Sequence, residues 1–286
     1  MHGVLDRVGP DDIRTEPFAH LVVENCLPPE YFRALADAYP PDEQVLQLNG
    51  WRRGGPVQPN QRNDISAHQV LAEPGLVAPI WDAFVRHHTS PAFYAEVVRV
   101  FGPALRATYP DLEQRLGGSL ETLHSGVRFA GDDDPGPISL DCQIGINTPV
   151  TRRSSVRRVH TDAPEELFAM LLYFRRDEDD SHGGDLELHR WKPGRAHRFL
   201  GSECDDGDAI QIGSVPYRPN TLVAFVNSAE SLHAVSERDI TPHSRRLVNI
   251  IGEVYKALPE GLFVKEQKWS APWRRRWARW KGRLGG

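Results

Sequence analysis

The spacing of hydrophobic residues changes near residue 123, and this change divides the chain into two parts. Before it, apolar residues recur every three or four positions, as on one face of a helix, after a first strand over residues 20–27. Residues 50–63 are rich in Gly, Pro, Asn and Gln and read as a loop. Residues 1–122 are therefore expected to form a helical support region packed on the rest. The expected helices cover residues 30–38, 75–88, 90–105 and 111–116.

After residue 123, short apolar segments alternate with turn signals. About eight such segments predict a mainly β core with flanking helices, an α+β arrangement built on a jelly roll, the double-stranded β-helix of cupin-like proteins. We expect this jelly-roll core over residues 123–258, within one structural domain overall. The clearest strand segments are 124–129, 139–146, 167–174, 185–189, 209–212, 221–226 and 245–255.

The composition limits the classes of function. Hydrophobic residues make up 40% of the chain and charged residues 26%, as in ordinary globular proteins. The formal net charge of -5 provides no global basic field, so no nucleic-acid partner is expected.

Cysteine usage and apolar runs bear on location. Cys26, Cys142 and Cys204 are far apart and lack a CxxC spacing, which argues against a zinc ribbon or a disulfide framework. The longest apolar run, residues 168–174, is too short to cross a bilayer, and the N-terminus lacks the apolar run of a signal peptide. A cytoplasmic, reducing location is therefore expected.

One short motif carries candidate metal chemistry. His160 and Asp162 stand two positions apart, so in an extended chain the imidazole and the carboxylate face the same side. His233 follows the apolar segment over residues 221–226 and can supply a third ligand if the strands are neighbours. Two imidazoles and one carboxylate on one face leave three coordination positions open, an arrangement characteristic of non-haem Fe(II) oxygenases. Without His233, the pair would be read as an ordinary surface contact.

A pair of arginines follows twelve and thirteen residues after His233, at the start of the last strand segment. An iron-bound 2-oxoglutarate projects its second carboxylate into the barrel, and a rigid guanidinium matches a carboxylate with two parallel hydrogen bonds. Arg245 shares a strand face with polar Asn249, whereas Arg246 shares its face with Val248. We therefore expect Arg245 to bind the cosubstrate, with Arg246 as the alternative.

Taken together, these residues resemble the 2-oxoglutarate/Fe(II)-dependent dioxygenases of the prolyl-4-hydroxylase-like type. The resemblance covers about residues 140–255, and the family's order of HxD, His and then Arg or Lys is intact. The segments that carry it are VRRVHTD at 156–162, MLLYF at 170–174, GGDLEL at 183–188, PNTLVAFVNSAESLHAV at 219–235 and RRLVNI at 245–250.

The resemblance implies an enzyme that uses Fe(II), O2 and 2-oxoglutarate as cosubstrate, with ascorbate as an additive in vitro. It would hydroxylate an unactivated C–H bond and release succinate and CO2, with His160, Asp162 and His233 as metal ligands and catalytic residues. Tyr173 matches a family tyrosine that helps to bind the remote carboxylate of 2-oxoglutarate. Because Tyr173 lies in a continuous apolar run, a core aromatic is an equal alternative. The family's tyrosine in the strand before HxD is replaced here by the sequence QIGINTP.

Three functions are consistent with these residues. We expect a small-molecule substrate, such as an amino acid, a sugar-like metabolite or a natural product. The first alternative is the same chemistry on a prolyl or other residue of a protein or peptide. The second is a non-catalytic, cupin-like protein that binds or senses a metal. Arg245 and Tyr173 argue against a pure metal sensor, which needs neither.

Other candidate features receive a structural interpretation. His182 and His189 flank a Gly-Gly turn and are expected to be ordinary turn and strand histidines. Residues 259–286 form a Trp- and Arg-rich C-terminal helix or tail. Its tryptophans at positions 273, 277 and 280 share one helix face, so we expect an amphipathic helix packed on the domain. Docking to an anionic membrane surface or an acidic partner is the alternative.

Overall fold

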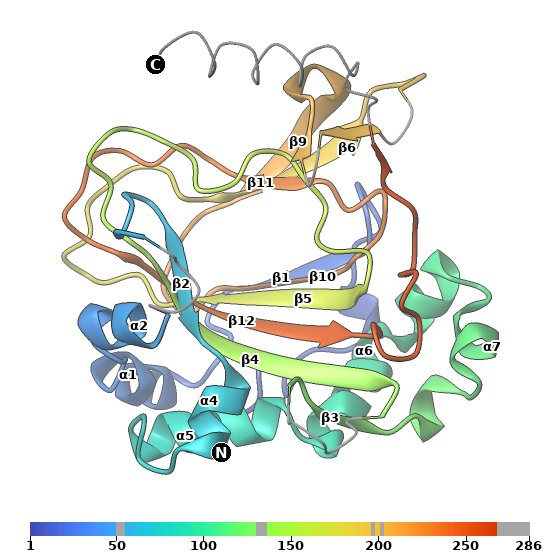
Figure 1. Ribbon diagram of the computed structural model, residues 1–286, viewed down its shortest axis with the longest axis horizontal. Coiled ribbons are helices and arrows are strands. Elements are labelled where there is room, and N and C mark those ends of the chain that lie inside the picture. Colours follow the sequence, from blue (N-terminus) through green and yellow to red (C-terminus); the bar gives the residue numbers. More distant parts are fainter. Residues whose placement is uncertain (50–54, 130–135, 196–197, 201–202, 268–286) are drawn as a thin grey trace, which may run out of the picture.

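The computed structural model describes residues 1–49, 55–129, 136–195, 198–200 and 203–267 (Figure 1). A large sheet and a smaller one face each other, and helices cover the outer side of the large sheet (Figure 1). Successive strands of the C-terminal half pass from one sheet to the other. The fold is therefore the mainly β jelly roll with flanking helices that the sequence predicts.

The large sheet has seven strands, and neighbours are antiparallel apart from the β3–β4 pair. Its order is β1 (His20–Val23), β10 (Leu222–Val226), β5 (Glu166–Tyr173), β12 (Arg245–Glu253), β4 (Ile138–Asn147) and β2 (Arg62–Ile65), with β3 (Ser125–Val127) beside β4. The smaller sheet has the order β11 (His233–Val235), β6 (Leu186–Trp191) and β9 (Ala209–Val215). Three short strands, β13 (Glu266–Gln267), β7 (Arg198–Leu200) and β8 (Glu203–Cys204), form a third sheet.

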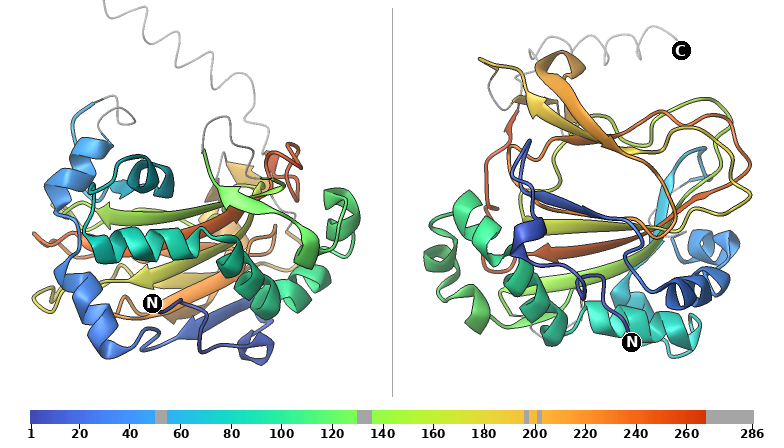
Figure 2. Two further views of the ribbon diagram at one scale, coloured as in Figure 1. Left: turned by 90° about the horizontal axis from the view of Figure 1, so that it is seen from below. Right: turned by 180° about the vertical axis from the view of Figure 1, so that it is seen from behind.

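The helices come from the N-terminal part of the chain, and α5 and α6 cross the outer face of the large sheet (Figure 2). Helix α6 starts sharply because the Ser90 hydroxyl accepts the Phe93 N–H at 3.2 Å and Pro91 occupies the first helical position. The α-helices are α1 (Pro29–Asp37), α2 (Asp42–Leu48), α4 (Ala67–Ala72), α5 (Pro79–His88), α6 (Pro91–Thr108) and α7 (Leu112–Leu116). Short 3-10 turns lie at η1 (Pro10–Asp12), η2 (Leu120–Thr122) and η3 (Asp206–Asp208).

The large sheet is buried on both faces, so its strands separate two hydrophobic layers. In β12, Val248 and Ile250 pack outward in the layer shared with the helices. Leu247 and Ile251 pack inward in the layer shared with the smaller sheet. The alternation predicted for this strand is thus confirmed. Polar side chains interrupt the inner layer where a cavity lies between the two sheets.

The sequence analysis did not predict several short elements, and β2 is the one most important for the cavity. Residues 50–63 were predicted to be a loop, but Arg62 and Asn63 begin β2, so that part of the prediction is wrong. The strand has the sequence RNDI and pairs with β4 through its backbone, so no apolar alternation reveals it. Helices α2 and α4 and strand β11 were missed for a similar reason, because each is too short to show a period.

The tryptophans of the C-terminal segment fall within residues 268–286, which lie outside the described residues. The amphipathic helix expected there stays a prediction. Where the chain is described, none of its helices combines enough length and apolarity to span a membrane.

His88 links the N-terminal segment to helix α5. Its Nδ1–H donates to the Phe84 carbonyl at 2.7 Å, and its Nε2 accepts the Val4 N–H at 3.1 Å. The side chain is fully buried, and burial lowers the pKa of His88 to about 3. A neutral imidazole is therefore part of the folded structure at neutral pH.

We predict that His88 makes the fold sensitive to acid. The unfolded chain takes up a proton at this group near the ordinary pKa of about 6.5, whereas the folded chain does so only near pH 3. Between these values the unfolded state binds more protons, so stability falls as the pH falls, by at most about 1.4 kcal/mol per pH unit from this group. Urea unfolding between about pH 4 and 7 should show a weaker pH dependence for His88→Gln than for the wild type.

The matched control for this prediction is His68→Gln, because His68 is exposed. That variant should keep the wild-type dependence of the unfolding free energy on pH. An unchanged pH dependence in His88→Gln would contradict the prediction.

Candidate metal centre

The backbone brings the two predicted histidine ligands face to face. His160 and His233 form an isolated antiparallel bridge whose two N–H···O bonds are both 2.9 Å long. His233 is also the first residue of β11, which pairs with β6. Asp162 reaches the same side, and one ligand atom from each of the three lies within 4.8 Å of the others. We call these three residues the triad.

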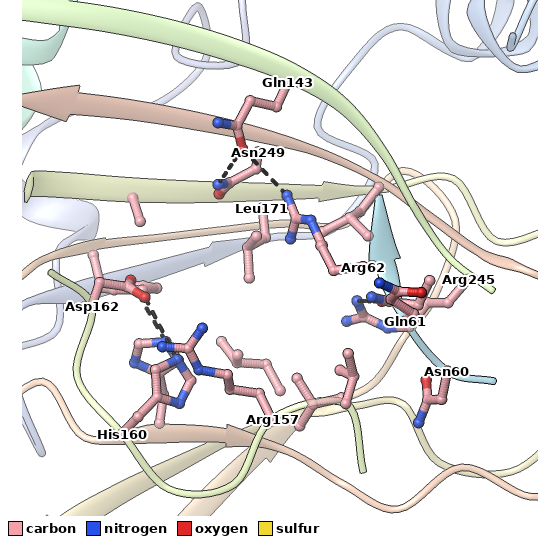
Figure 3. Close-up of a pocket in the computed structure, with 18 of the residues that line it drawn as sticks. Asn60, Gln61, Arg62, Gln143, Arg157, His160, Asp162, Leu171, Arg245 and Asn249 are labelled. Atoms are coloured by element: carbon pink, nitrogen blue, oxygen red, sulfur yellow. Dashed lines mark hydrogen bonds and ion pairs between the residues drawn. The ribbon is translucent and has the colours of Figure 1, made fainter. Parts of the chain in front are cut away.

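The imidazoles are oriented by hydrogen bonds on their far sides. His160 Nδ1 lies 2.7 Å from the Arg158 carbonyl and His233 Nδ1 lies 2.9 Å from the Ser231 carbonyl. Each Nδ1 must therefore carry the proton, which leaves Nε2 with a free lone pair. These Nε2 atoms lie 3.5 and 3.6 Å from the two carboxylate oxygens of Asp162 (Figure 3). Three lone pairs thus converge on one point between the side chains.

Two members of the triad, His160 and Asp162, are held in the protonation states that bind a cation. Burial and the neighbouring His233 lower the pKa of His160 to about 4. Burial alone would raise the pKa of Asp162, but the two imidazoles hold it well below its ordinary value. A neutral imidazole and an ionised carboxylate are the forms that coordinate divalent metals. At neutral pH His160 and Asp162 therefore need no proton loss before they can bind a metal.

The triad opens into a cavity of about 480 Å³ between the two sheets (Figure 3). Apolar side chains from β5, β6 and β10 form part of its wall, among them Leu171, Leu186 and Phe225. Polar side chains from β4, β12 and β2 form another part. The triad lies at one end of this cavity and Arg245 at the opposite end (Figure 3).

Arg245 is buried and held in a fixed position, with 3% of its surface exposed. Its Nε donates to the Gly184 carbonyl at 2.8 Å, and Nη1 donates to Asn147 Oδ1 at 3.3 Å. The guanidinium carbon also lies 4.9 Å and 4.8 Å from the ring centroids of Tyr173 and Tyr217. These contacts restrict the side chain to one direction, along the cavity toward the triad.

Three buried donors near this arginine have no hydrogen-bond partner among the described residues. They are Arg245 Nη2, Asn147 Nδ2 and the Tyr173 hydroxyl. A buried donor without an acceptor costs about 1–3 kcal/mol, more when it is charged. Two of them, Arg245 Nη2 and Asn147 Nδ2, belong to residues that line the cavity, and they indicate a place for an anionic acceptor. A carboxylate has the right shape for a guanidinium edge.

Arg246 points to the other face of β12, away from the cavity. Its guanidinium carbon lies 4.7 Å from the Tyr39 ring centroid, and Nη2 lies 3.7 Å from Asp42 Oδ1. The structure therefore places Arg245 at the cavity and Arg246 under helices α1 and α2. Tyr173 lies behind Arg245, in contact with it but outside the cavity wall.

A buried ion pair supports the turn that positions Arg245. Arg238 Nη2 lies 2.6 Å from Asp179 Oδ2, and both side chains are almost fully buried. The adjoining turn contains Gly183 at φ +82°, where a Cβ would stand 1.8 Å from the Glu237 carbonyl oxygen. Only glycine allows this close approach, which brings the carbonyl of Gly184 to the arginine.

The two histidines that flank the Gly-Gly turn lie outside the triad. His182 is exposed, and His189 contacts Glu187 at 3.2 Å. Among the described residues, the triad is the sole group of three or more His, Cys, Asp or Glu side chains close enough to share a metal ion.

Sequence reasoning missed most of the polar cavity wall. Gln143 and Asn147 come from β4, and Arg62 comes from β2. The β4 sequence DCQIGIN does place polar residues at every second position of a buried strand, and this alternation was a usable signal. For Arg62 the sequence offered none, because β2 itself was not recognised.

No family model and no curated protein sequence matches this chain. Among solved structures, it is similar to a prolyl-4-hydroxylase from Pseudomonas putida, with 15% identity, 82% of this chain and 91% of that chain covered, and a TM-score of 0.40. It is also similar to the non-heme alpha ketoglutarate dependent carbocyclase SnoK from nogalamycin biosynthesis, with 13% identity, 88% and 87% covered, and a TM-score of 0.49.

A third similar structure is a Trichoplax adhaerens prolyl hydroxylase in complex with a hypoxia inducible factor peptide, with 11% identity, 84% and 86% covered, and a TM-score of 0.39. These proteins are of the class that the sequence motifs resemble. Because the similarity is distant, the function is inferred from the geometry of the triad and its cavity.

We predict that Asp179→Asn destabilises the protein strongly. The substitution leaves the Arg238 guanidinium buried without its counter-charge, which costs roughly 3 kcal/mol of unfolding free energy. Urea unfolding measures the loss. The same substitution at the neighbouring, exposed Asp180 is the control and should change stability little. Equal effects of the two substitutions would show that the buried pair does not support the fold.

Proposed function

We propose that this chain is a 2-oxoglutarate- and Fe(II)-dependent oxygenase that hydroxylates a C–H bond of a small molecule. One observation carries the proposal. A two-histidine, one-carboxylate triad faces a cavity whose opposite end holds a buried arginine with an unpaired Nη2 donor. The first half of this arrangement fits Fe(II), and the second half fits the remote carboxylate of a dicarboxylic 2-oxo acid.

The triad would hold the metal from one side. His160, Asp162 and His233 offer one anionic oxygen and two neutral nitrogens, all on the same face. The three side chains face the cavity, so a metal that they held would be accessible from the cavity to a chelating cosubstrate and O2. The carbonyls of Arg158 and Ser231 keep the two imidazoles in the required tautomer and orientation.

Arg245 would fix the far end of 2-oxoglutarate. A carboxylate at this point would accept hydrogen bonds from Arg245 Nη2 and from Asn147 Nδ2, which both belong to residues that line the cavity. Binding would then give partners to donors that are otherwise buried without one. The binding free energy would therefore include relief of their desolvation penalty as well as the new hydrogen bonds. A protein that only binds or senses a metal has no need of these donors, and this disfavours the sensor hypothesis.

Iron and 2-oxoglutarate, when bound, supply an oxidative decarboxylation to succinate and CO2 that is coupled to hydroxylation of a C–H bond. The chain's own residues supply geometry and exclusion of water. The apolar wall from β5 and β10 would limit water at the place where the triad would hold the metal, and the Arg245 guanidinium of β12 would hold the remote carboxylate of the cosubstrate.

The cavity favours a small molecule over a peptide. Its volume of about 480 Å³ falls within the roughly 300–1,000 Å³ typical of small-molecule sites. Of the similar structures, the prolyl hydroxylase complex holds a peptide and SnoK belongs to natural-product biosynthesis. The proposal also includes a reducing, cytoplasmic location, which is supported by the burial of Cys26, Cys142 and Cys204 as thiols.

We predict that the triad is required for both metal binding and turnover. His160→Ala and His233→Ala should each abolish stoichiometric Fe(II) binding, measured by calorimetry under anaerobic conditions. Both should also abolish succinate formation from 2-oxoglutarate in the presence of ascorbate and O2. His182→Ala is the matched control because His182 is exposed and lies outside the triad. Retention of iron and turnover by either triad variant would refute the site.

We predict that Arg245 and Arg246 differ sharply in their effect on the cosubstrate. Loss of a charge-assisted hydrogen bond of about 1.5–3 kcal/mol should weaken 2-oxoglutarate binding by about 10- to 100-fold in Arg245→Gln. Arg246→Gln removes the same charge from the opposite face of β12 and should change affinity by less than about threefold. Calorimetric titration of the Mn(II)-loaded proteins with 2-oxoglutarate compares them. Similar losses in both variants would mean that the cavity arginine does not bind the cosubstrate.

A further inference from the structure

Two more arginines reach the cavity between the triad and Arg245. Arg62 enters from β2 at the edge of the large sheet, and Arg157 enters from the segment before His160. Figure 3 shows the guanidinium groups of both side chains extending into the space in front of the triad. Neither is needed to hold the metal or the remote carboxylate in the proposed function.

Arg62 is oriented by a chain of hydrogen bonds that begins at a buried carboxylate. Asp141 accepts the Gln143 side-chain N–H at 2.9 Å, so the Gln143 carbonyl oxygen must face the cavity. That oxygen accepts from Asn249 at 3.2 Å and from Arg62 Nη2 at 3.5 Å (Figure 3). Because Asn249 uses its N–H2 group in this contact, its own carbonyl oxygen is left as an acceptor for a ligand. These hydrogen bonds hold Arg62 against the polar wall of the cavity.

The charge of Arg62 is only loosely compensated. Its closest anionic contact is with Asp64 Oδ2, which lies 3.8 Å from Arg62 Nε. The Arg62 side chain is 33% exposed at this point. Such a pair contributes little at an exposed position. The remaining donors of the Arg62 fork can therefore take a second anion from the cavity side.

Arg157 has no compensating contact in the described part of the chain. Its backbone is fixed, since its carbonyl accepts the Val235 N–H at 3.0 Å, but its guanidinium has no hydrogen bond or ion pair there. The side chain lies close enough to His160 to disfavour a positive charge on that imidazole. Arg157 is exposed, so its guanidinium is solvated and is available to an anion that binds at this side of the cavity.

The cofactors themselves do not supply that anion. Fe(II), Asp162, Arg245 and a doubly charged 2-oxoglutarate sum to no net charge. The second carboxyl group of the cavity lining, Glu166, does not supply it either, because burial and the neighbouring carboxylates Asp162 and Glu253 raise its pKa well above the ordinary value. Two arginines therefore still face the space that the substrate would occupy.

On the basis of the proposed function, we propose that the substrate is a small molecule with an acidic group, a carboxylate or a phosphate, that Arg62 and Arg157 bind. The acidic group would lie toward the open side of the cavity. An adjacent hydrogen-bond donor of the substrate would meet the Asn249 carbonyl oxygen, and the carbon to be hydroxylated would then lie between the arginines and the triad. This arrangement selects charged metabolites and rejects their neutral analogues.

The test measures binding to the protein loaded with Mn(II) and saturating 2-oxoglutarate, so that Arg245 is already occupied and no turnover occurs. The probes are matched acids and amides: benzoate with benzamide, N-acetyl-L-leucine with its amide, and N-acetyl-L-proline with its amide. Phenyl phosphate with phenol forms the phosphate arm. Affinities come from calorimetry, and thermal unfolding provides a second readout of the same binding.

We expect at least one acid or phosphate ester to bind about tenfold or more tightly than its neutral partner. Arg62→Gln and Arg157→Gln should each remove most of this preference. Arg190→Gln is the matched control, because Arg190 is exposed on β6 and does not line the cavity. The preferred arm, carboxylate or phosphate, identifies the acidic group.

Two failures are distinguishable. If the wild type does not bind 2-oxoglutarate at all, the proposed function and this inference both fall. If 2-oxoglutarate binds normally in all four proteins but no acidic probe binds better than its neutral partner, only the inference is overturned. A preference for acids that persists in both Arg62→Gln and Arg157→Gln would also overturn it.

Discussion

The two backbone hydrogen bonds between His160 and His233 are the constraint on which the site depends. They join two segments that are distant in sequence, and they involve backbone atoms alone. Once the backbones are paired, both imidazoles fall on the same side with ring centroids 4.2 Å apart. The carbonyls of Arg158 and Ser231 then leave a single orientation for each ring. The jelly roll supplies this pairing because successive strands cross between its sheets.

The polar groups at the two ends of the cavity differ in how rigidly they are held. At the inner end, Arg245 is locked by Gly184, Asn147 and two tyrosine rings, so it can recognise only a ligand of one length. Toward the edge of the large sheet, Arg62 is held more loosely and can adapt to different ligands. Under the proposed function, the rigid end would hold the cosubstrate and the adaptable end would hold the substrate.

The sequence predicted the parts of the site that follow a regular period or a known order. The face of β12 that carries Arg245 could be assigned because Val248 and Ile250 mark the opposite face as buried under helices. The triad could be proposed because its spacing and order are characteristic. Arg62 could not be found, because β2 is defined by backbone pairing with β4 and its side chains show no pattern. The support by Asp179 and Arg238 was equally hidden, since a buried ion pair is a tertiary contact between loops.

The glycine turn beside Arg245 has a consequence for how the protein can change over evolution. Any side chain at position 183 would collide with the Glu237 backbone and push away the segment that carries Arg238. A substitution at position 183 would therefore disrupt the turn, whereas β2 is a short edge strand whose side chains are partly exposed. Substitutions along that edge can therefore reshape the cavity wall at Arg62 without disturbing the turn that holds Arg245.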